Sequence, residues 1–151
     1  MSNKVKYVHT GLIARDWRRM VAFYVEVFGF TRTDNHIDAS GEIAEELTNI
    51  PEVAIRGTHL GFPGCPGVTM EILEYAPPVY RAGESAVNDQ GFTHLAFEVA
   101  SIPEVLEKMR AHGCDTLGEE ACMECPDGRT LTLVFARDPE GNVIELQSFA
   151  D

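Results

Sequence analysis

The strongest constraint on the fold is an internal repeat, because a chain built from two similar segments is expected to fold as two similar modules. The stretches VHTGLIARDWRRMVAFYVEVFGF (8–30) and FTHLAFEVASIPEVLEKMRAHG (92–113) have the same order of features. Each has a β-prone run, a helix-capping residue, a helical pattern and a glycine. Each β-prone run also holds a histidine at a matching place, His9 in the first and His94 in the second. The sequence therefore predicts two related modules that each begin with a strand and a helix.

The two predicted helices have recognisable ends. Asp16 is a plausible N-cap for the first helix, and Gly29 is placed to terminate it. In the second helix Ser101 and Glu104 have the spacing of a capping box, and Gly113 follows the last helical residue. These local signals fix where each helix begins and ends.

Each helix is followed by β-rich segments. These are AIRGTHLGF (54–62) and VTMEILEY (68–75) in the first half, and TLTLVFARD (130–138) and NVIELQSF (142–149) in the second. The last segment of each half has a glutamate flanked by apolar residues, Glu71 in one and Glu145 in the other. The first half is longer because of an insertion at 33–53, which we expect to be a loop or lid that shapes a pocket, with a short helical pattern after Ser40.

The pattern predicts an α+β fold of two βαβββ modules with a cupped mixed sheet. We expect a single domain over 1–151, with module 1 at about 5–76 and module 2 at about 91–150. The Pro- and Gly-rich stretch 76–91 is the expected crossover between the modules.

The two histidines and two glutamates are expected to lie on the sheet faces that point away from the helices. Side chains alternate across a strand, and the apolar residues next to these four are suited to pack against a helix on the other face. His9, Glu71, His94 and Glu145 then project from the opposite, concave face. Two imidazoles and two carboxylates suit a divalent metal ion such as nickel, cobalt, manganese, iron or zinc. Four protein ligands on a six-coordinate ion leave two positions for water or substrate, which points to chemistry rather than to a structural site.

The motifs VHTGLIARDWRRMVAFYVEVFGF, FTHLAFEV, MEILEY and VFARDPEGNVIELQ resemble segments of the vicinal oxygen chelate superfamily. This superfamily includes glyoxalase I, methylmalonyl-CoA epimerase, extradiol dioxygenases and proteins that confer resistance to bleomycin or fosfomycin. The resemblance implies metal ligands at the first-strand histidine and last-strand glutamate of each module, here His9, Glu71, His94 and Glu145. This is the ligand set of bacterial glyoxalase I.

The resemblance also implies a mechanism and an assembly. The metal acts as a Lewis acid on a substrate carbonyl, and a glutamate takes the adjacent carbon-bound proton to give a metal-stabilised enediolate. Glu145 is our expected base, with Glu71 as its competitor. The pocket in this superfamily is often built by modules from two chains, so a homodimer is expected.

Other residues carry weaker signals. His59, Tyr75, Phe92 and Glu98 share faces with the expected ligands and are candidates for the substrate pocket, although each is also consistent with ordinary packing. The CMEC motif at 122–125 has the C-x-x-C spacing of half a zinc site, but no second pair accompanies it, which favours ordinary thiols.

Charge and hydropathy limit the partners. The chain has a formal charge of −12, which disfavours nucleic acid and anionic membrane surfaces. It has no apolar run suited to a signal peptide or a membrane helix, so we expect a cytoplasmic protein whose partner is a small-molecule substrate.

The sequence thus favours a metal-dependent lyase or isomerase of the glyoxalase I type that acts on a small oxygenated metabolite. Two alternatives remain open. One is an iron-dependent extradiol-type dioxygenase, which prefers two histidines and one carboxylate. The other is a non-catalytic protein that binds a small molecule or an antibiotic.

Overall fold

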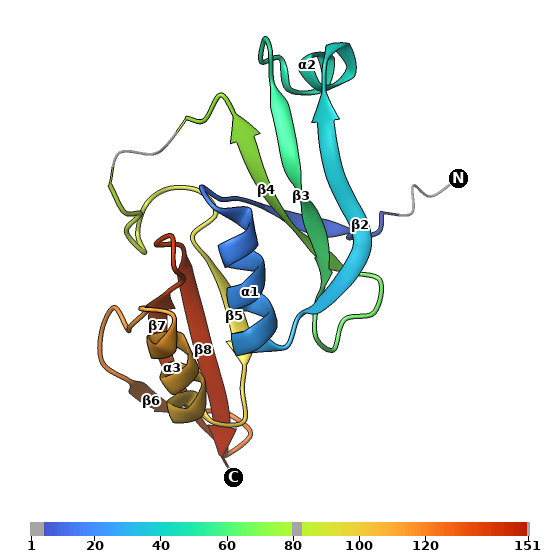
Figure 1. The fold of residues 1–151 in the computed structure, drawn as a ribbon. Coiled ribbons are helices and arrows are strands. Elements are labelled where there is room, and N and C mark those ends of the chain that lie inside the picture. Colours follow the sequence, from blue (N-terminus) through green and yellow to red (C-terminus); the bar gives the residue numbers. More distant parts are fainter. Residues whose placement is uncertain (1–4, 80–82, 151) are drawn as a thin grey trace. The chain divides into compact units, whose positions relative to one another are not determined.

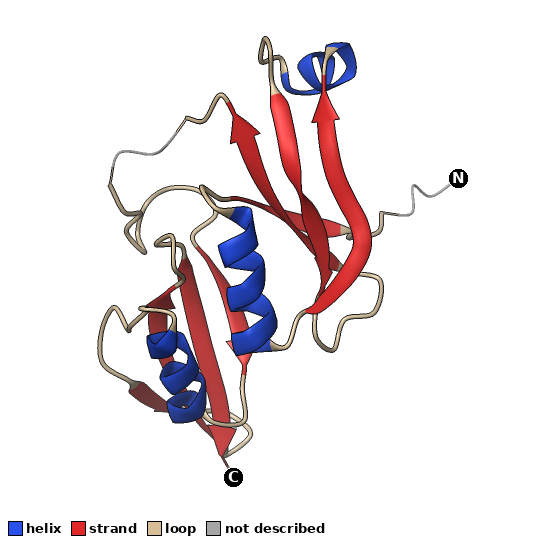
Figure 2. Ribbon diagram, viewed as in Figure 1, coloured by secondary structure: helices blue, strands red, loops and turns tan. Residues whose placement is uncertain are grey.

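A computed structural model describes residues 5–79 and 83–150 and divides the chain into two compact units, residues 1–80 and 81–151. Unit 1 contains β1 (His9–Ile13), α1 (Trp17–Phe28), β2 (Thr31–Ser40), α2 (Glu42–Thr48), β3 (Ala54–Gly61) and β4 (Thr69–Ala76). Unit 2 contains β5 (His94–Glu98), α3 (Ile102–Ala111), β6 (Ala121–Glu124), β7 (Thr130–Arg137) and β8 (Val143–Ala150) (Figures 1 and 2). The predicted βαβββ order is confirmed in both units, with α2 as an addition to the first.

The two units have the same sheet topology, as the repeat requires. The strands form two four-stranded mixed sheets, with the orders β1-β4-β3-β2 and β5-β8-β7-β6. In each sheet the first strand pairs in parallel with the last strand, and the remaining pairs are antiparallel. The α+β class is therefore confirmed. This topology places the histidine-bearing strand of each unit directly beside its glutamate-bearing strand.

Helix α1 begins and ends where the local signals predict. The Asp16 carboxylate accepts a hydrogen bond from the Arg19 backbone N–H at 3.0 Å, and Gly29 has the left-handed φ of 71° that suits a helix terminus. The helix packs against β3 and β4, whose residues Leu60, Met70 and Ile72 are fully buried. The helix-facing side of this sheet is thus apolar, and Glu71 points to the other side.

Helix α3 repeats this arrangement in unit 2. The Ser101 hydroxyl accepts a hydrogen bond from the Glu104 backbone N–H at 3.3 Å, and Gly113 follows the helix with a φ of 79°. The buried face of the helix includes Leu106 and Met109, and the helix packs against β8. Ile144 and Leu146 of β8 are buried on this side, which leaves Glu145 on the opposite face.

The 33–53 segment is more ordered than expected. Its first part is not a loop, because residues 31–40 form β2, which pairs antiparallel with β3 across a register irregularity between Arg32 and His36. The expected short helix after Ser40 is confirmed as α2. Ala44 of α2 is buried in a small apolar cluster with Val53, Ile55 and Leu73, and this cluster ties the inserted segment to the sheet. The prediction of a loop was wrong for the first part of the segment because these residues pair with β3.

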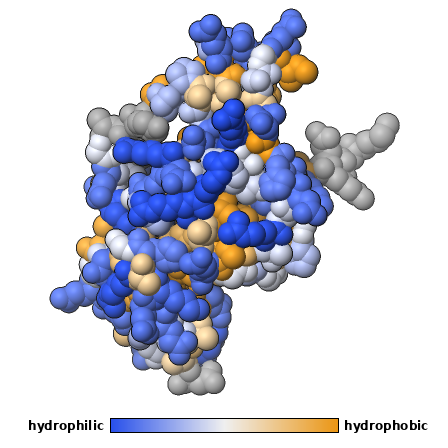
Figure 3. All heavy atoms as spheres, viewed as in Figure 1, coloured by the Kyte–Doolittle hydropathy of each residue, from blue (hydrophilic) through white to orange (hydrophobic). Residues whose placement is uncertain are grey.

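One face of the molecule is mostly hydrophilic (Figure 3). On the face shown in Figure 3 hydrophilic residues predominate, with apolar residues scattered among them. Within residues 5–79 and 83–150, no helix combines the length and apolarity needed to cross a bilayer.

Candidate metal centre

In unit 1 an imidazole and a carboxylate meet on neighbouring strands. His9 lies on β1 and Glu71 on β4, and His9 Nε2 is 3.3 Å from Glu71 Oε2. Gly11 is the direct register partner of Glu71 and lies two residues after His9, on the same face of β1. The absence of a side chain at Gly11 leaves the surface beside the carboxylate open. A Cβ atom at Gly11 would lie 3.8 Å from Glu71 Oε2.

His59 approaches the second oxygen of the same carboxylate. It lies on β3 as the register partner of Glu71, and its Nε2 is 3.1 Å from Glu71 Oε1. Its other ring nitrogen, Nδ1, is 2.9 Å from the Thr69 hydroxyl. The His59 side chain is only 13% exposed. Thr69 and Glu71 therefore hold both nitrogens of this imidazole, and the two imidazoles of unit 1 approach different oxygens of Glu71.

Unit 2 contains the equivalent pair. His94 Nε2 on β5 is 3.1 Å from Glu145 Oε2 on β8, and Ala96 takes the place of Gly11 as the register partner of the glutamate. The Gln147 side-chain amide donates to Glu145 Oε1 at 2.6 Å. The Thr93 hydroxyl lies 2.8 Å from His94 Nδ1. Both oxygens of this carboxylate thus have a partner, as in unit 1.

The second partner of each glutamate comes from a different place in the repeat. His59 faces Glu71 across β3 and β4, and the matching register partner of Glu145 is Phe135 on β7. Each of these rings stands edge-on to the first-strand histidine of its own unit. The centroid distance is 5.8 Å for His9 and His59, and 5.2 Å for His94 and Phe135. Each unit therefore has an aromatic ring beside its first-strand histidine. This ring is the polar His59 in unit 1 and the apolar Phe135 in unit 2.

The separations of these pairs suit two ligands of one ion. Donors about 2.1 Å from a metal at octahedral or tetrahedral angles lie about 3.0 to 3.4 Å from each other. The His9–Glu71 and His94–Glu145 distances of 3.3 Å and 3.1 Å fall within this range. In the part of the chain that the structure describes, no group of three or more His, Cys, Asp or Glu side chains is arranged to hold a metal ion. The predicted ligands thus form one histidine–glutamate pair in each unit.

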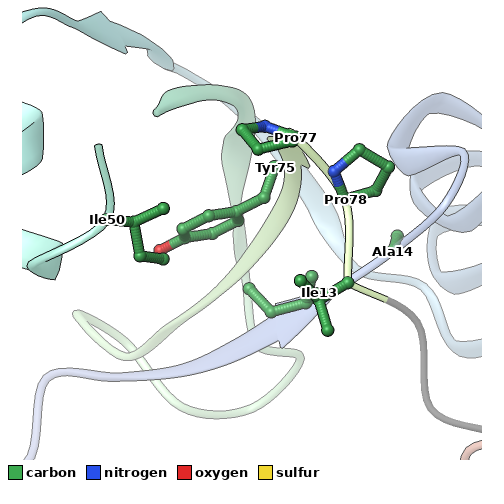
Figure 4. Close-up of a pocket in the computed structure, with 7 residues that line it drawn as sticks. Ile13, Ala14, Ile50, Tyr75, Pro77 and Pro78 are labelled. Atoms are coloured by element: carbon green, nitrogen blue, oxygen red, sulfur yellow. The ribbon is translucent and has the colours of Figure 1, made fainter. Parts of the chain in front are cut away.

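The remaining predicted site residues lie in different surroundings. Tyr75, near the end of β4, lines a hollow of about 240 Å³ (Figure 4). Phe92, just before β5, is fully exposed, and Glu98 at the end of β5 is also exposed. The hollow does not include His59, Phe92 or Glu98.

The CMEC thiols contribute no metal cluster among the described residues. Cys122 is exposed on β6, and its Sγ is 3.4 Å from the Thr132 hydroxyl.

The sequence analysis did not identify Thr69, Thr93 and Gln147, which contact His59, His94 and Glu145 respectively. Gln147 follows Glu145 by two residues on the same face of β8, and this spacing was an available signal. Thr69 was not foreseeable in the same way, because its contact with His59 crosses between two strands.

Solved structures with the same fold include three proteins of different kinds. A glyoxalase family protein from Bacillus cereus has a TM-score of 0.84 at 20% identity, with 99% of this chain and 97% of that chain covered. The trypanothione-dependent glyoxalase I of Leishmania major has a TM-score of 0.57 at 22% identity, with 96% and 87% covered. The fosfomycin resistance protein FosX of Listeria monocytogenes, solved with Mn(II) and sulfate, has a TM-score of 0.51 at 16% identity, with 98% and 93% covered.

Comparison of the sequence with known proteins identifies the family of the chain. No curated protein matches it significantly. The sequence model of the Glyoxalase/Bleomycin resistance protein/Dioxygenase superfamily, however, matches residues 6–146, which span both units and all four histidine and glutamate positions. The chain belongs to the Glyoxalase/Bleomycin resistance protein/Dioxygenase superfamily.

Proposed function

We propose that the protein is a metal-dependent lyase or isomerase of the glyoxalase I type that acts on a small oxygenated metabolite. One observation carries the proposal. At equivalent register positions of the repeat, each unit presents an imidazole nitrogen and a carboxylate oxygen at the separation of neighbouring metal ligands. The family includes such enzymes, and one structural relative, FosX, was solved with Mn(II).

The proposed ligands are His9, Glu71, His94 and Glu145, which together hold one divalent ion. The mixed nitrogen and oxygen set suits nickel, cobalt, zinc, manganese or iron. Thr93 lies at Nδ1 of His94 and can fix the tautomer whose Nε2 is free to bind a metal. When bound, the ion supplies a Lewis acid that polarises a substrate carbonyl and acidifies the neighbouring C–H group.

Glu145 is the proposed general base, with Glu71 as the competing candidate. The base takes a proton from the carbon beside the carbonyl. It then returns the proton to the neighbouring carbon in an isomerisation, or to the same carbon in an epimerisation. The hydrogen bond from Gln147 to Glu145 Oε1 holds that carboxylate in a defined orientation for the transfer.

We further propose that the protein acts as a homodimer. Each described unit supplies one histidine–glutamate pair, and an assembly that joins a first unit to a second unit completes the set of four. A dimer with twofold symmetry would contain two such sets.

The first test is the metal content of the purified protein. Wild type is expected to hold about one divalent ion per chain, and His9→Ala, His94→Ala and Glu145→Ala are each expected to lose it, because removing one ligand weakens the whole site. His36→Ala, which changes an exposed histidine on β2, is the matched control and should retain the ion.

The design separates one shared site from two independent sites. If the ligands form one site, a change in unit 1 and a change in unit 2 cause the same loss. Retention of metal in either His9→Ala or His94→Ala, or absence of metal from wild type refolded with excess metal ions, would contradict the proposal.

The second test follows the transferred proton. Metal-loaded protein in deuterium oxide should exchange the carbon-bound proton of its substrate, assayed by NMR on a panel of hemithioacetals and α-hydroxy ketones. Glu145→Gln should slow this exchange by about 100-fold or more at saturating metal, because the base is lost. A slower exchange in Glu71→Gln than in Glu145→Gln would assign the base to Glu71.

A second candidate function is the binding of a small molecule without catalysis. The apolar hollow of unit 1 favours it, since such a pocket can hold a ligand with no metal. Binding of an apolar compound that persists after chelation, together with no proton exchange on any substrate of the panel, would support this function. An iron-dependent dioxygenase would instead consume oxygen in the presence of catechols.

A further inference from the structure

The hollow of unit 1 is apolar and belongs to that unit alone. Its lining residues are Ile13, Ala14, Ile50, Tyr75, Pro77, Pro78 and Val79. The only polar side-chain atom among them is the Tyr75 hydroxyl, and none of the side chains is charged. Figure 4 shows the Tyr75 ring pointing from β4 toward Ile50, with Ile13 and the two prolines around it. Such a lining favours an uncharged group, because a charge buried there would have no partner.

The hollow lies on the same strands and the same sheet face as the candidate ligands. Ile13 follows His9 by four residues on β1, and Tyr75 follows Glu71 by four residues on β4. Residues separated by an even number along a strand share a face, and each residue advances the strand by about 3.3 Å. The hollow is therefore about 13 Å along the strands from the His9–Glu71 pair.

On β1 the surface between the ligand pair and the hollow is low, whereas on β4 Leu73 lies between Glu71 and Tyr75 on this face. Gly11 is the residue of β1 between His9 and Ile13 on this face, and it has no side chain. A Cβ atom placed there would contact only Glu71 Oε2 within 4 Å, so the space above Gly11 is otherwise open. An extended group can follow β1 from the carboxylate toward the hollow without meeting a side chain at this position.

The inserted segment shapes the far wall of the hollow. Ile50 follows α2, and Tyr75 packs against the apolar cluster of Ala44, Val53, Ile55 and Leu73. The segment is absent from the second half of the repeat. The repeat alone therefore does not produce the hollow, which makes it a feature suited to set specificity.

We propose that this hollow binds the apolar end of the substrate. This inference rests on the proposed function. The substrate class is a small molecule with oxygen atoms on two neighbouring atoms at one end and an uncharged alkyl or aryl group at the other. The oxygens are held at the His9–Glu71 end of the sheet, and the apolar group lies against Ile13, Ile50 and Tyr75.

The test uses alkyl hydroxamates, whose two adjacent oxygens chelate a metal and whose chain length can be varied. Dissociation constants of acetohydroxamate, hexanohydroxamate and decanohydroxamate are measured by calorimetry on the metal-loaded protein. Binding should tighten with chain length once the chain reaches the hollow. The expected gain is up to about fourfold for each buried methylene, the fold-change that corresponds to about 0.8 kcal/mol.

Ile50→Ser and Ile13→Ser test the lining, and Ile43→Ser is the matched control. Ile43 is 81% exposed on α2 and does not line the hollow. Ile50 and Ile13 are also partly exposed, which favours normal folding of their serine variants. Each lining variant should weaken decanohydroxamate binding by about tenfold through lost apolar contact, with acetohydroxamate binding unchanged. The control should match wild type for both ligands.

Three outcomes would overturn the inference. If acetohydroxamate binds but longer chains bind no better, or if the lining variants match Ile43→Ser, the hollow does not receive the apolar group. If the gain with chain length persists after the metal is removed by a chelator, the hollow acts separately from the ligands. If acetohydroxamate does not bind in a metal-dependent way, the proposed function fails, and the inference fails with it.

Discussion

Each candidate glutamate is held by two partners, and the second partner differs between the units. Glu71 contacts His59 from the neighbouring strand, and Glu145 accepts a hydrogen bond from Gln147 on its own strand. At the position that corresponds to His59 in the repeat the chain has Phe135, and at the position that corresponds to Gln147 it has Leu73. Groups that orient a metal ligand without touching the metal often determine how tightly the metal is held.

The repeat itself supplies the substitutions that test these partners. His59→Phe and Gln147→Leu each install the residue that the other unit carries, so both shapes already occur in this fold. Each variant should bind the metal about 10- to 100-fold more weakly, because one carboxylate oxygen loses its partner. Competition with a coloured chelator measures the affinity.

The matched control for His59→Phe is His36→Phe, which changes an exposed histidine in the same sheet. Unchanged affinity in His59→Phe, with circular dichroism equal to wild type, would mean that His59 only packs against His9.

At the scale of the elements, β3 and β4 approach closely between the ligand pair and the hollow. Gly57 on β3 is the register partner of Leu73 and lies two residues from His59. A Cβ atom at Gly57 would be 2.0 Å from the Ile72 carbonyl oxygen. This separation is too short for two non-bonded atoms. A larger residue would therefore force the two strands apart at the centre of this sheet.

Gly57→Ala should lower the free energy of unfolding by about 1 to 3 kcal/mol, the usual cost of overpacking. The matched control is Gly61→Ala in the same strand, where the new Cβ would have its nearest contact at 3.7 Å, with Thr31, and no left-handed backbone is involved. Urea unfolding followed by circular dichroism measures both. Equal stability of the two variants would show that the strands can separate at Gly57 without cost.

At the scale of the whole molecule, the donors are divided between two units of equal topology. Each unit has a histidine on its first strand and a glutamate on its last strand. Because the unit is the repeating element, the proposed site can be completed either within one chain or by two chains. The homodimer proposal favours completion by two chains.

A complementation experiment distinguishes these arrangements. Neither His9→Ala nor His94→Ala alone should bind metal, but a mixture allowed to exchange subunits should regain about a quarter of the wild-type metal content. In a random mixture of twofold dimers, half are mixed, and each mixed dimer has one intact site of two. Metal analysis after subunit exchange, with exchange verified by mass-labelled chains, provides the measurement. No recovery would mean that both donor pairs come from a single chain.

Much of this organisation could be predicted from the sequence because it depends on local rules. The caps at Asp16 and Ser101 and the glycines at 29 and 113 act within one turn of helix, and the structure confirms them. Strand alternation also separates Glu71 and Glu145 from their buried apolar neighbours without reference to distant residues. The repeat then extends each local conclusion from one half of the chain to the other.

The rest depended on contacts between strands that are separate in the sequence. Cross-strand register determines the strand at 31–40 and the contact of His59 with Glu71. The packing of the inserted segment determines the hollow that Ile50 lines. A one-residue change of register would place His59 on the opposite face, and nothing local to His59 fixes that register. The sequence alone thus determined the repeated modules and the faces of their histidines and glutamates. Only the tertiary structure decided which side chains hold those groups and where an apolar ligand can fit, because both depend on strands meeting across the sheet.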